Sequence, residues 1–294
     1  MKPKIIGTGL SGLVGSRIVE LLSEKYDFSD LSLDKGIDIT QPFQVERTIK
    51  ESPGQIVLHL AAFTNVDQAW QQQGDKNGSC YQVNVIGTRN IAQVCAQYKK
   101  HLIHISTDYV FDGQKDRPFT EKDQPNPIEW YGRTKYWAEQ EVEKSGAKYS
   151  LARIAFPFRA DFGPKKDIVR EISQKIREGT LPPMFADQQI TPTFIDDLAY
   201  ALKIVIQKKP IGIYHLVGST ILTPYELACQ IAETFSFDKK KIKKGSLKEY
   251  LKTNPRPRGF NMGLANQKAK KELGIKMKTV KQALQLIKDQ REKD

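Results

Sequence analysis

The hydrophobic positions in the first half of the chain follow two periods. Short apolar runs, typical of strands in a buried parallel sheet, alternate with segments whose apolar residues recur every three or four positions, as in amphipathic helices. The predicted strands are 4–6, 31–33, 55–60, 102–106 and 149–154, and the predicted helices between them are 12–23, 42–51, 81–98 and 130–144. This alternation predicts a parallel sheet with helices on both faces.

The second half of the chain is less regular. Proline and glycine residues interrupt it at 163–164 and 182–183, and one more strand is predicted at 213–217. From residue 223 onward the pattern is mostly helical, except at 254–259. The predicted fold class is therefore α/β, a Rossmann-type doubly wound parallel sheet with a smaller, mostly helical C-terminal part.

Glycines are concentrated directly after the first predicted strand. One register, Gly7 with Gly9 and Gly12, matches G-x-G-x-x-G, and a second, Gly9 with Gly12 and Gly15, matches G-x-x-G-x-x-G after Thr8. The second is favoured because Gly15 then lies one helical turn beyond Gly12, where helix and strand must pack closely. Such a loop at a helix N-terminus binds a pyrophosphate, so we expect a dinucleotide here. The predicted contacts are Gly9, Leu10, Ser11, Gly12, Leu13 and Val14.

The choice between NAD(H) and NADP(H) depends on the end of the second predicted strand. Asp34 could accept hydrogen bonds from the adenosine ribose, which favours NAD(H). Lys35 could instead neutralise a 2′-phosphate, which favours NADP(H). Both could also be ordinary turn residues, so the sequence leaves the cofactor open as NADP(H) or NAD(H).

The chain carries a net charge of +12, and its lysines gather at 239–244 and 268–293. They alternate with apolar positions such as Val280 and Leu284, which indicates a solvated helix face rather than a nucleic-acid site. A second interpretation is attraction of an anionic substrate such as a nucleotide diphosphate.

Other compositional signals point to the cytoplasm. We expect no membrane partner, because the chain contains no run of eighteen apolar residues. The apolar stretch near Met1 is too short and too rich in glycine for a signal peptide. The three cysteines are scattered, which favours reduced thiols and no metal site.

A tyrosine and a lysine lie four residues apart on one face of a predicted helix, at Tyr131 and Lys135. A nearby cation lowers the pKa of a tyrosine from its usual value near 10, which helps proton transfer at neutral pH. The upstream segment 104–113 follows a buried strand, so the hydroxyl of Ser106 or Thr107 is expected at the same edge of the sheet.

Together these motifs resemble the extended short-chain dehydrogenase/reductase family. That family shows T-G-x-x-G-x-x-G, an H-x-A-A strand end, a Ser/Thr and Y-x-x-x-K, and the chain has 8–15, 59–62, Thr107 and 131–135 in that order. Within the family the chain is most similar to the dTDP-4-dehydrorhamnose reductases. The segments that match their signatures are 106–113, 118–127 and 131–135, with 65–69 and 191–198 as further likenesses.

The resemblance implies NAD(P)H-dependent reduction of a nucleotide-linked 4-keto-6-deoxysugar. Tyr131 would give a proton to the keto oxygen, Lys135 would bond the nicotinamide ribose and lower the pKa of Tyr131, and Thr107 would orient the carbonyl. Asn84 would support Lys135 through water. Further cofactor contacts implied are Asp38, Ile39, Leu60, Ala61 and Ala62, and the implied substrate contacts are Thr107, Asp108, Phe156 and Arg256.

The resemblance also implies two domains. Residues 1–155, with 186–218 returning to them, would form the dinucleotide-binding domain. Residues 156–185 and 219–294 would form the substrate-binding domain. A nucleotide sugar is the expected partner, and a homodimer is a possible assembly.

Two positions depart from the reductase pattern. Phe156 stands where those reductases usually carry a tryptophan near the substrate, which leaves the identity of the sugar open. The segment 70–79 looks unusual and is interpreted as an enlarged surface loop or, alternatively, a partner contact.

Two rival functions remain open. One is a sugar-nucleotide epimerase or dehydratase, but dehydratases of the family follow the threonine with Asp-Glu, whereas Tyr109 follows Asp108 here. The other is a non-catalytic subunit that binds a dinucleotide, similar to the regulatory subunit of methionine adenosyltransferase. Intact Thr107, Tyr131 and Lys135 favour an enzyme.

Overall fold

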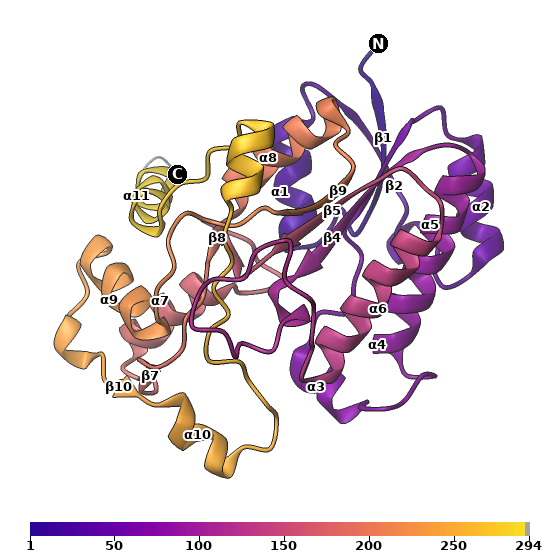
Figure 1. Ribbon diagram of the computed structural model, residues 1–294. Helices are drawn as coiled ribbons and strands as arrows, with labels where there is room; N and C mark the ends of the chain where they lie inside the picture. Colours follow the sequence, from indigo (N-terminus) through magenta and orange to yellow (C-terminus); the bar gives the residue numbers. More distant parts are fainter. Residues whose placement is uncertain (292–294) are drawn as a thin grey trace.

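The computed structural model describes residues 1–291 (Figure 1). Six strands, all paired in parallel, form one sheet in the order β2-β1-β3-β4-β5-β9. Their bounds are β1 Lys4–Thr8, β2 Asp27–Asp30, β3 Ile56–His59, β4 His101–Thr107, β5 Tyr149–Ile154 and β9 Gly212–His215. The parallel sheet confirms the predicted α/β fold class.

Helices cover both faces of the sheet, with α1 and α8 on one face and α2, α5 and α6 on the other (Figure 1). Consecutive strand residues feed opposite cores, because side chains alternate along a strand. Ile5 packs in the core with α1 and α8, whereas Ile6 packs in the core with α2 and α5. The helix bounds are α1 Leu13–Leu22, α2 Pro42–Glu51, α3 Val66–Gln71, α4 Ser79–Tyr81, α5 Thr88–Gln97, α6 Trp130–Lys144 and α8 Ile195–Lys208.

One predicted strand was wrong. The second strand is Asp27–Asp30, and Leu33–Lys35 instead forms a 3-10 turn, η1. β2 pairs only with β1 at the edge of the sheet, so three of its four residues are polar and it lacks an apolar signature. Leu31 is buried just after the strand, and Leu33 is 73% exposed.

The predicted helix 81–98 contains a change of helix type. A π-helical segment, η2 Gln82–Gly87, lies between α4 and α5. It places Asn84, Val85 and Gly87 in buried positions.

A smaller part with its own core lies beside the sheet (Figure 1). Its elements are α7 Ile168–Glu178, α9 Pro224–Thr234, α10 Leu247–Thr253 and α11 Val280–Arg291, with the strand pairs β6 Pro157–Phe158 and β8 Thr193–Phe194, and β7 Met184–Phe185 and β10 Lys244–Gly245. Ile190 and Phe194, from the segment expected to return to the larger domain, contribute to this smaller core. Three short helical turns complete the structure: η3 Asp108–Val110, η4 Lys239–Lys241 and η5 Ala269–Leu273.

Two features of the described residues bear on partners. Within residues 1–291 no helix is long and apolar enough to cross a membrane. In the same range no group of three histidine, cysteine or acidic side chains is placed to hold a metal ion.

A buried ion pair joins β5 to α6 beneath the sheet edge. Arg153 donates to the Glu139 carboxylate through Nε at 2.9 Å and Nη2 at 2.6 Å, and Ser106 Oγ donates to the same carboxylate at 2.5 Å. Arg153 and Glu139 are each 1% exposed. Neither charge has access to water, so each depends on the other.

We therefore expect Arg153→Met to lower the free energy of unfolding by about 3–5 kcal/mol, because it leaves the Glu139 charge buried without its partner. Urea denaturation followed by circular dichroism would measure this loss. Arg47→Met, at an exposed position of α2, is the control and should change stability by less than about 0.5 kcal/mol. Equal stability of both variants would contradict a dependence of the fold on this pair.

Candidate active site

A cavity of about 800 Å³ lies at the carboxyl edge of the sheet. Its walls come from the segments that follow the strands β1 to β6, and from the first turns of α6. β2 and β3 lie on opposite sides of β1, so the strand order reverses there. Ligands of open α/β sheets bind at such a switch point.

The glycine loop enters this cavity in the second of the two registers. Gly9 has φ +66°, and a Cβ there would lie 2.7 Å from the Ala61 amide nitrogen. A Cβ on Gly15 would collide with the Gly9 carbonyl oxygen and with Leu10. The first register gives Gly7 no ligand role, because it makes room for the Leu10 side chain.

The same loop fits the pyrophosphate of a dinucleotide. A Cβ on Gly12 would meet only the Gly9 carbonyl oxygen, at 3.3 Å, so the space beyond it is open. No side chain caps α1 at Gly12, and its first turn contains no acidic residue. The N–H groups and positive end of α1 are thus available to an anion.

Most of the predicted cofactor contacts line the cavity, and two of them, Leu10 and Asn84, do not. The lining residues among them are Gly9, Ser11, Gly12, Leu13, Val14, Asp38, Ile39, Leu60, Ala61, Ala62, Tyr131 and Lys135. Leu10 is 6% exposed and packs on Gly7 instead. Asp34 lines the cavity, with its carboxylate 3.4 Å from Ser11 Oγ, whereas Lys35 is not among the lining residues.

Asn84 is buried between the segment after β3 and α6. Its amide accepts from the Phe63 N–H at 2.8 Å and donates to Thr134 Oγ1 at 3.0 Å. It is 1% exposed and holds the segment after β3 against α6. The structure therefore gives Asn84 a positioning role next to Lys135, and its support of that lysine through water stays a prediction.

Thr107, Asp108, Tyr131 and Lys135 all line the cavity. The Thr107 hydroxyl caps η3 by accepting from the Tyr109 N–H at 3.3 Å and donates to Asp108 Oδ1 at 3.0 Å. These bonds fix the turn from the end of β4 into η3.

Glu129, which the sequence reasoning missed, fixes the start of α6. Its carboxylate accepts from the N–H groups of Tyr131 at 3.0 Å and Gly132 at 2.5 Å. Gly132 lets the helix approach the Tyr109 carbonyl, where a Cβ would collide. Burial raises the pKa of Glu129 to about 7, although both N–H bonds oppose the shift. An acidic residue directly before a predicted helix was the available signal.

The pKa of Tyr131 runs against the expectation. Burial raises it above the usual tyrosine value, and the negative charges of Asp108 and Glu129 raise it further. A hydrogen bond with Thr107 lowers it only in part. The charge of Lys135 is not among the main causes of the shift; its amine donates to the Ile105 carbonyl at 2.8 Å and lies 3.4 Å from His104 Nε2.

Lys135 is itself buried. Burial lowers its pKa to about 8, with a smaller opposing effect from the Glu139 charge. Below it, burial lowers the pKa of His104, and it lowers that of His59 to about 3. Both imidazoles are therefore neutral near pH 7. His59 lies between Thr8 Oγ1 at 2.7 Å and Thr88 Oγ1 at 3.0 Å, which ties β1 to α5.

The two remaining substrate predictions separate. Phe156 lines the cavity and adopts φ +43° at the end of β5. Arg256 is not among the lining residues and pairs with Asp67 at 2.9 Å. One guanidinium nitrogen of Arg256 is buried and has no hydrogen-bond partner in the described structure.

Several lining residues escaped the sequence reasoning. They include Leu31, Phe63, Thr64, Val83, Phe162, Pro164 and Lys165. Only the tertiary structure brings the last three there, because they belong to an irregular connection between β6 and α7.

Comparison with known proteins matches nearly the whole chain. The profile of the RmlD substrate binding domain family covers residues 3–292. The chain belongs to this family.

Individual relatives agree with the assignment. A dTDP-4-dehydrorhamnose reductase of Mycolicibacterium smegmatis is 30% identical over 87% of this chain and 77% of its own. A probable low-salt glycan biosynthesis reductase of Haloferax volcanii is 28% identical over 94% of each chain. The dTDP-4-dehydrorhamnose reductase of Bacillus anthracis, solved in complex with NADP, is 27% identical, with a TM-score of 0.89 over 99% of this chain and 100% of its own.

Membership of this family makes the chain an NAD(P)-dependent sugar-nucleotide reductase. This confirms the expectation of an enzyme. A dTDP-glucose 4,6-dehydratase of Bacillus anthracis shares the fold at 21% identity, with a TM-score of 0.80 over 99% of this chain and 97% of its own.

The buried Asp108 predicts a pH dependence of stability. Burial raises its pKa from 3.8 to about 7, the Glu129 charge adds to this, and hydrogen bonds from Thr107 and the backbone oppose it. Between these values the folded state keeps a proton that the unfolded chain has lost, so stability falls as pH rises from about 4 to about 7. We expect the free energy of unfolding of Asp108→Asn to fall less over this pH range than that of the wild type, by up to a few kcal/mol. Urea denaturation at several pH values would measure the difference. Parallel pH profiles for wild type and variant would contradict the assignment.

Proposed function

We propose that this RmlD-family reductase reduces the 4-keto group of a nucleotide-linked 4-keto-6-deoxysugar, of the dTDP-linked kind, with Tyr131 as the proton donor. One observation carries the proposal: Thr107, Tyr131 and Lys135 line the same cavity as the glycine loop. A reduced nicotinamide dinucleotide, bound at that loop, would supply the hydride.

The protein's own residues account for the rest of the reaction. The Thr107 hydroxyl orients the keto oxygen next to the Tyr131 hydroxyl. The phenol of Tyr131 is protonated at neutral pH, as a proton donor requires. The proton passes from the Tyr131 oxygen to the keto oxygen as the C–H bond forms at C4, which yields the alcohol. Phe156, on the cavity wall, offers an aromatic face to the sugar.

The cofactor environment supports NAD(H) rather than NADP(H). In the described cavity, the segment after β2 contributes Leu31, Ser32, Leu33, Asp34 and Ile37, with no lysine or arginine among them. The Asp34 carboxylate would repel a 2′-phosphate and accept from a ribose hydroxyl. We therefore propose NAD(H) as the preferred cofactor.

The direct test is an absorbance assay at 340 nm in which purified protein receives NADH or NADPH and a panel of nucleotide-linked 4-keto-6-deoxysugars. Oxidation of the dinucleotide with reduction of the sugar is the expected result. Dinucleotide binding without turnover of any panel member would favour the non-catalytic alternative. A change of sugar without net oxidation would favour an epimerase or dehydratase.

Tyr131→Phe should lower kcat by about 10²–10⁴-fold, because it removes the proton donor but keeps the aromatic ring. Dinucleotide affinity, measured by fluorescence titration, should change by less than about threefold. Tyr136→Phe is the matched control, since Tyr136 lies on the same helix and its hydroxyl accepts from Gln124 at 3.0 Å. Full turnover in the Tyr131 variant would exclude its proposed role.

Asp34→Ser should raise the ratio of kcat/KM for NADPH over NADH by about five- to tenfold, because a carboxylate near the 2′-phosphate is removed. Asp27→Ser makes the same change of charge at an exposed β2 position outside the cavity lining, and should leave the ratio unchanged. A wild-type preference for NADPH would disprove the cofactor assignment.

A further inference from the structure

The connection between β6 and α7, residues 159–167, forms a strap along the cavity. Phe162, Pro164 and Lys165 of the strap line the cavity together with the glycine loop. The strap belongs to the smaller part of the fold, whereas the glycine loop belongs to the sheet. Its position therefore decides how the two parts enclose a bound molecule.

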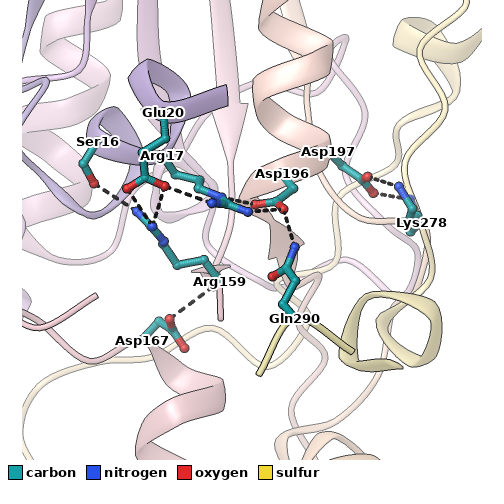
Figure 2. Close-up of polar contacts among 9 residues, drawn as sticks. All are labelled: Ser16, Arg17, Glu20, Arg159, Asp167, Asp196, Asp197, Lys278 and Gln290. Carbon is teal, nitrogen blue, oxygen red and sulfur yellow. Dashed lines mark hydrogen bonds and ion pairs between the residues drawn. The ribbon is translucent and has the colours of Figure 1, made fainter. Parts of the chain in front are cut away.

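Arg159 anchors the start of the strap to α1 (Figure 2). Its guanidinium donates to Ser16 Oγ at 3.0 Å and to both carboxylate oxygens of Glu20, at 2.8 and 3.0 Å. Glu20 also accepts from Arg17 at 2.9 Å, and Arg17 in turn forms two bonds of 2.7 Å with Asp196. Arg159 is only 7% exposed, so this contact is a built part of the fold. It links the strap to the helix that begins at the glycine loop.

Two further arginines hold the strap through its backbone. Arg170, on α7, donates to the Lys165 carbonyl at 2.5 Å and to the Phe162 carbonyl. Arg291, at the end of α11, donates to the Ala160 carbonyl at 2.7 Å. Asp167 ends the strap by capping α7 and accepts from the Arg159 N–H at 3.2 Å. The backbone on both sides of Lys165 is thereby fixed.

The Lys165 side chain reaches the opposite structural part. Its amine donates to Thr64 Oγ1 at 3.0 Å, and Thr64 lines the cavity after β3. Lys135 and Lys165 are the only lysines or arginines that line the cavity in the described chain. The Lys135 amine is committed to the buried Ile105 carbonyl, whereas Lys165 has no carboxylate partner among residues 1–291.

We propose that Lys165, delivered by the strap, is a further phosphate-binding residue of the cavity and pairs with a pyrophosphate. This rests on the proposed function, because a dinucleotide and a nucleotide sugar both carry that group. The end of α1 offers about half a positive charge, so a lysine beside it would add a charge-assisted hydrogen bond to a doubly charged pyrophosphate. The anchor on α1 favours the dinucleotide as the source.

The test uses the full chain and isothermal titration calorimetry at low salt, with NADH and dTDP as separate probes. Lys165→Ala should weaken NADH binding about tenfold, and Lys165→Arg should retain most of the affinity. Lys166→Ala is the matched control: it removes the same charge from the next residue, whose amine bonds Gln174 on α7 outside the cavity. It should leave both affinities unchanged.

The outcomes separate the two proposals. Weaker binding of dTDP alone would support the phosphate role and assign it to the nucleotide sugar. The role of Lys165 would be overturned if wild type, Lys165→Ala and Lys166→Ala bound each probe equally well. The proposed function would still stand if wild type bound and oxidised NADH. Failure of wild type to bind any dinucleotide would overturn the proposed function, and the dTDP titration would still decide on Lys165.

The strap itself is tested by Arg159→Gln, with thermal unfolding as the check on folding. If Arg159 acts by placing Lys165, Arg159→Gln should weaken NADH binding by a factor similar to that of Lys165→Ala. The double variant should then bind NADH only slightly more weakly than either single variant. Multiplicative losses in the double variant would show that Arg159 acts independently of Lys165, and would overturn the strap as the device that positions it.

Discussion

The close backbone approach at Gly9 is the constraint on which the rest of the site depends. Its positive φ turns the chain from β1 into α1, and only the absence of a Cβ lets it lie against the Ala61 amide at the end of β3. This contact brings the amino end of α1 to the sheet edge where β3 and β4 also end. The polar groups at these strand ends then share a cavity with the first turn of α1, and the strap anchored on α1 by Arg159 adds a further wall.

Burial dominates the chemistry of that cavity. The pKa values of Asp108, Glu129 and Tyr131 are all raised chiefly by loss of water, and that of Lys135 is lowered by the same cause. Protonated phenol is the form in which a tyrosine gives a proton to a keto oxygen. Tyr131 is thus a protonated phenol near pH 7, and the amine of the nearby Lys135 is held by the Ile105 carbonyl.

Local signals predicted the larger part of the fold and the chemical core of the site. Buried parallel strands have continuous apolar runs, so four of the five strands expected in the first half lie where they were placed. The edge strand Asp27–Asp30 is polar and was displaced in the prediction. Glu129 was missed although it directly precedes the predicted helix, the one local sign of its capping role. Arg256 was expected at the substrate, yet it lies outside the cavity lining and pairs with Asp67.

By itself, the sequence determined the alternating sheet and helices, the register of the glycine loop, and the shared edge of Thr107, Tyr131 and Lys135. Each follows from periodicity, from spacing along one element, or from the common edge at which parallel strands end. Only the tertiary structure decided which charges face the cavity. In the folded chain Asp34 lines the cavity and Arg256 pairs with Asp67. Lys165 donates to Thr64 from the strap, a segment with no periodic hydrophobic pattern. The physical reason is that such placements depend on contacts between segments far apart in the chain, which no local pattern records.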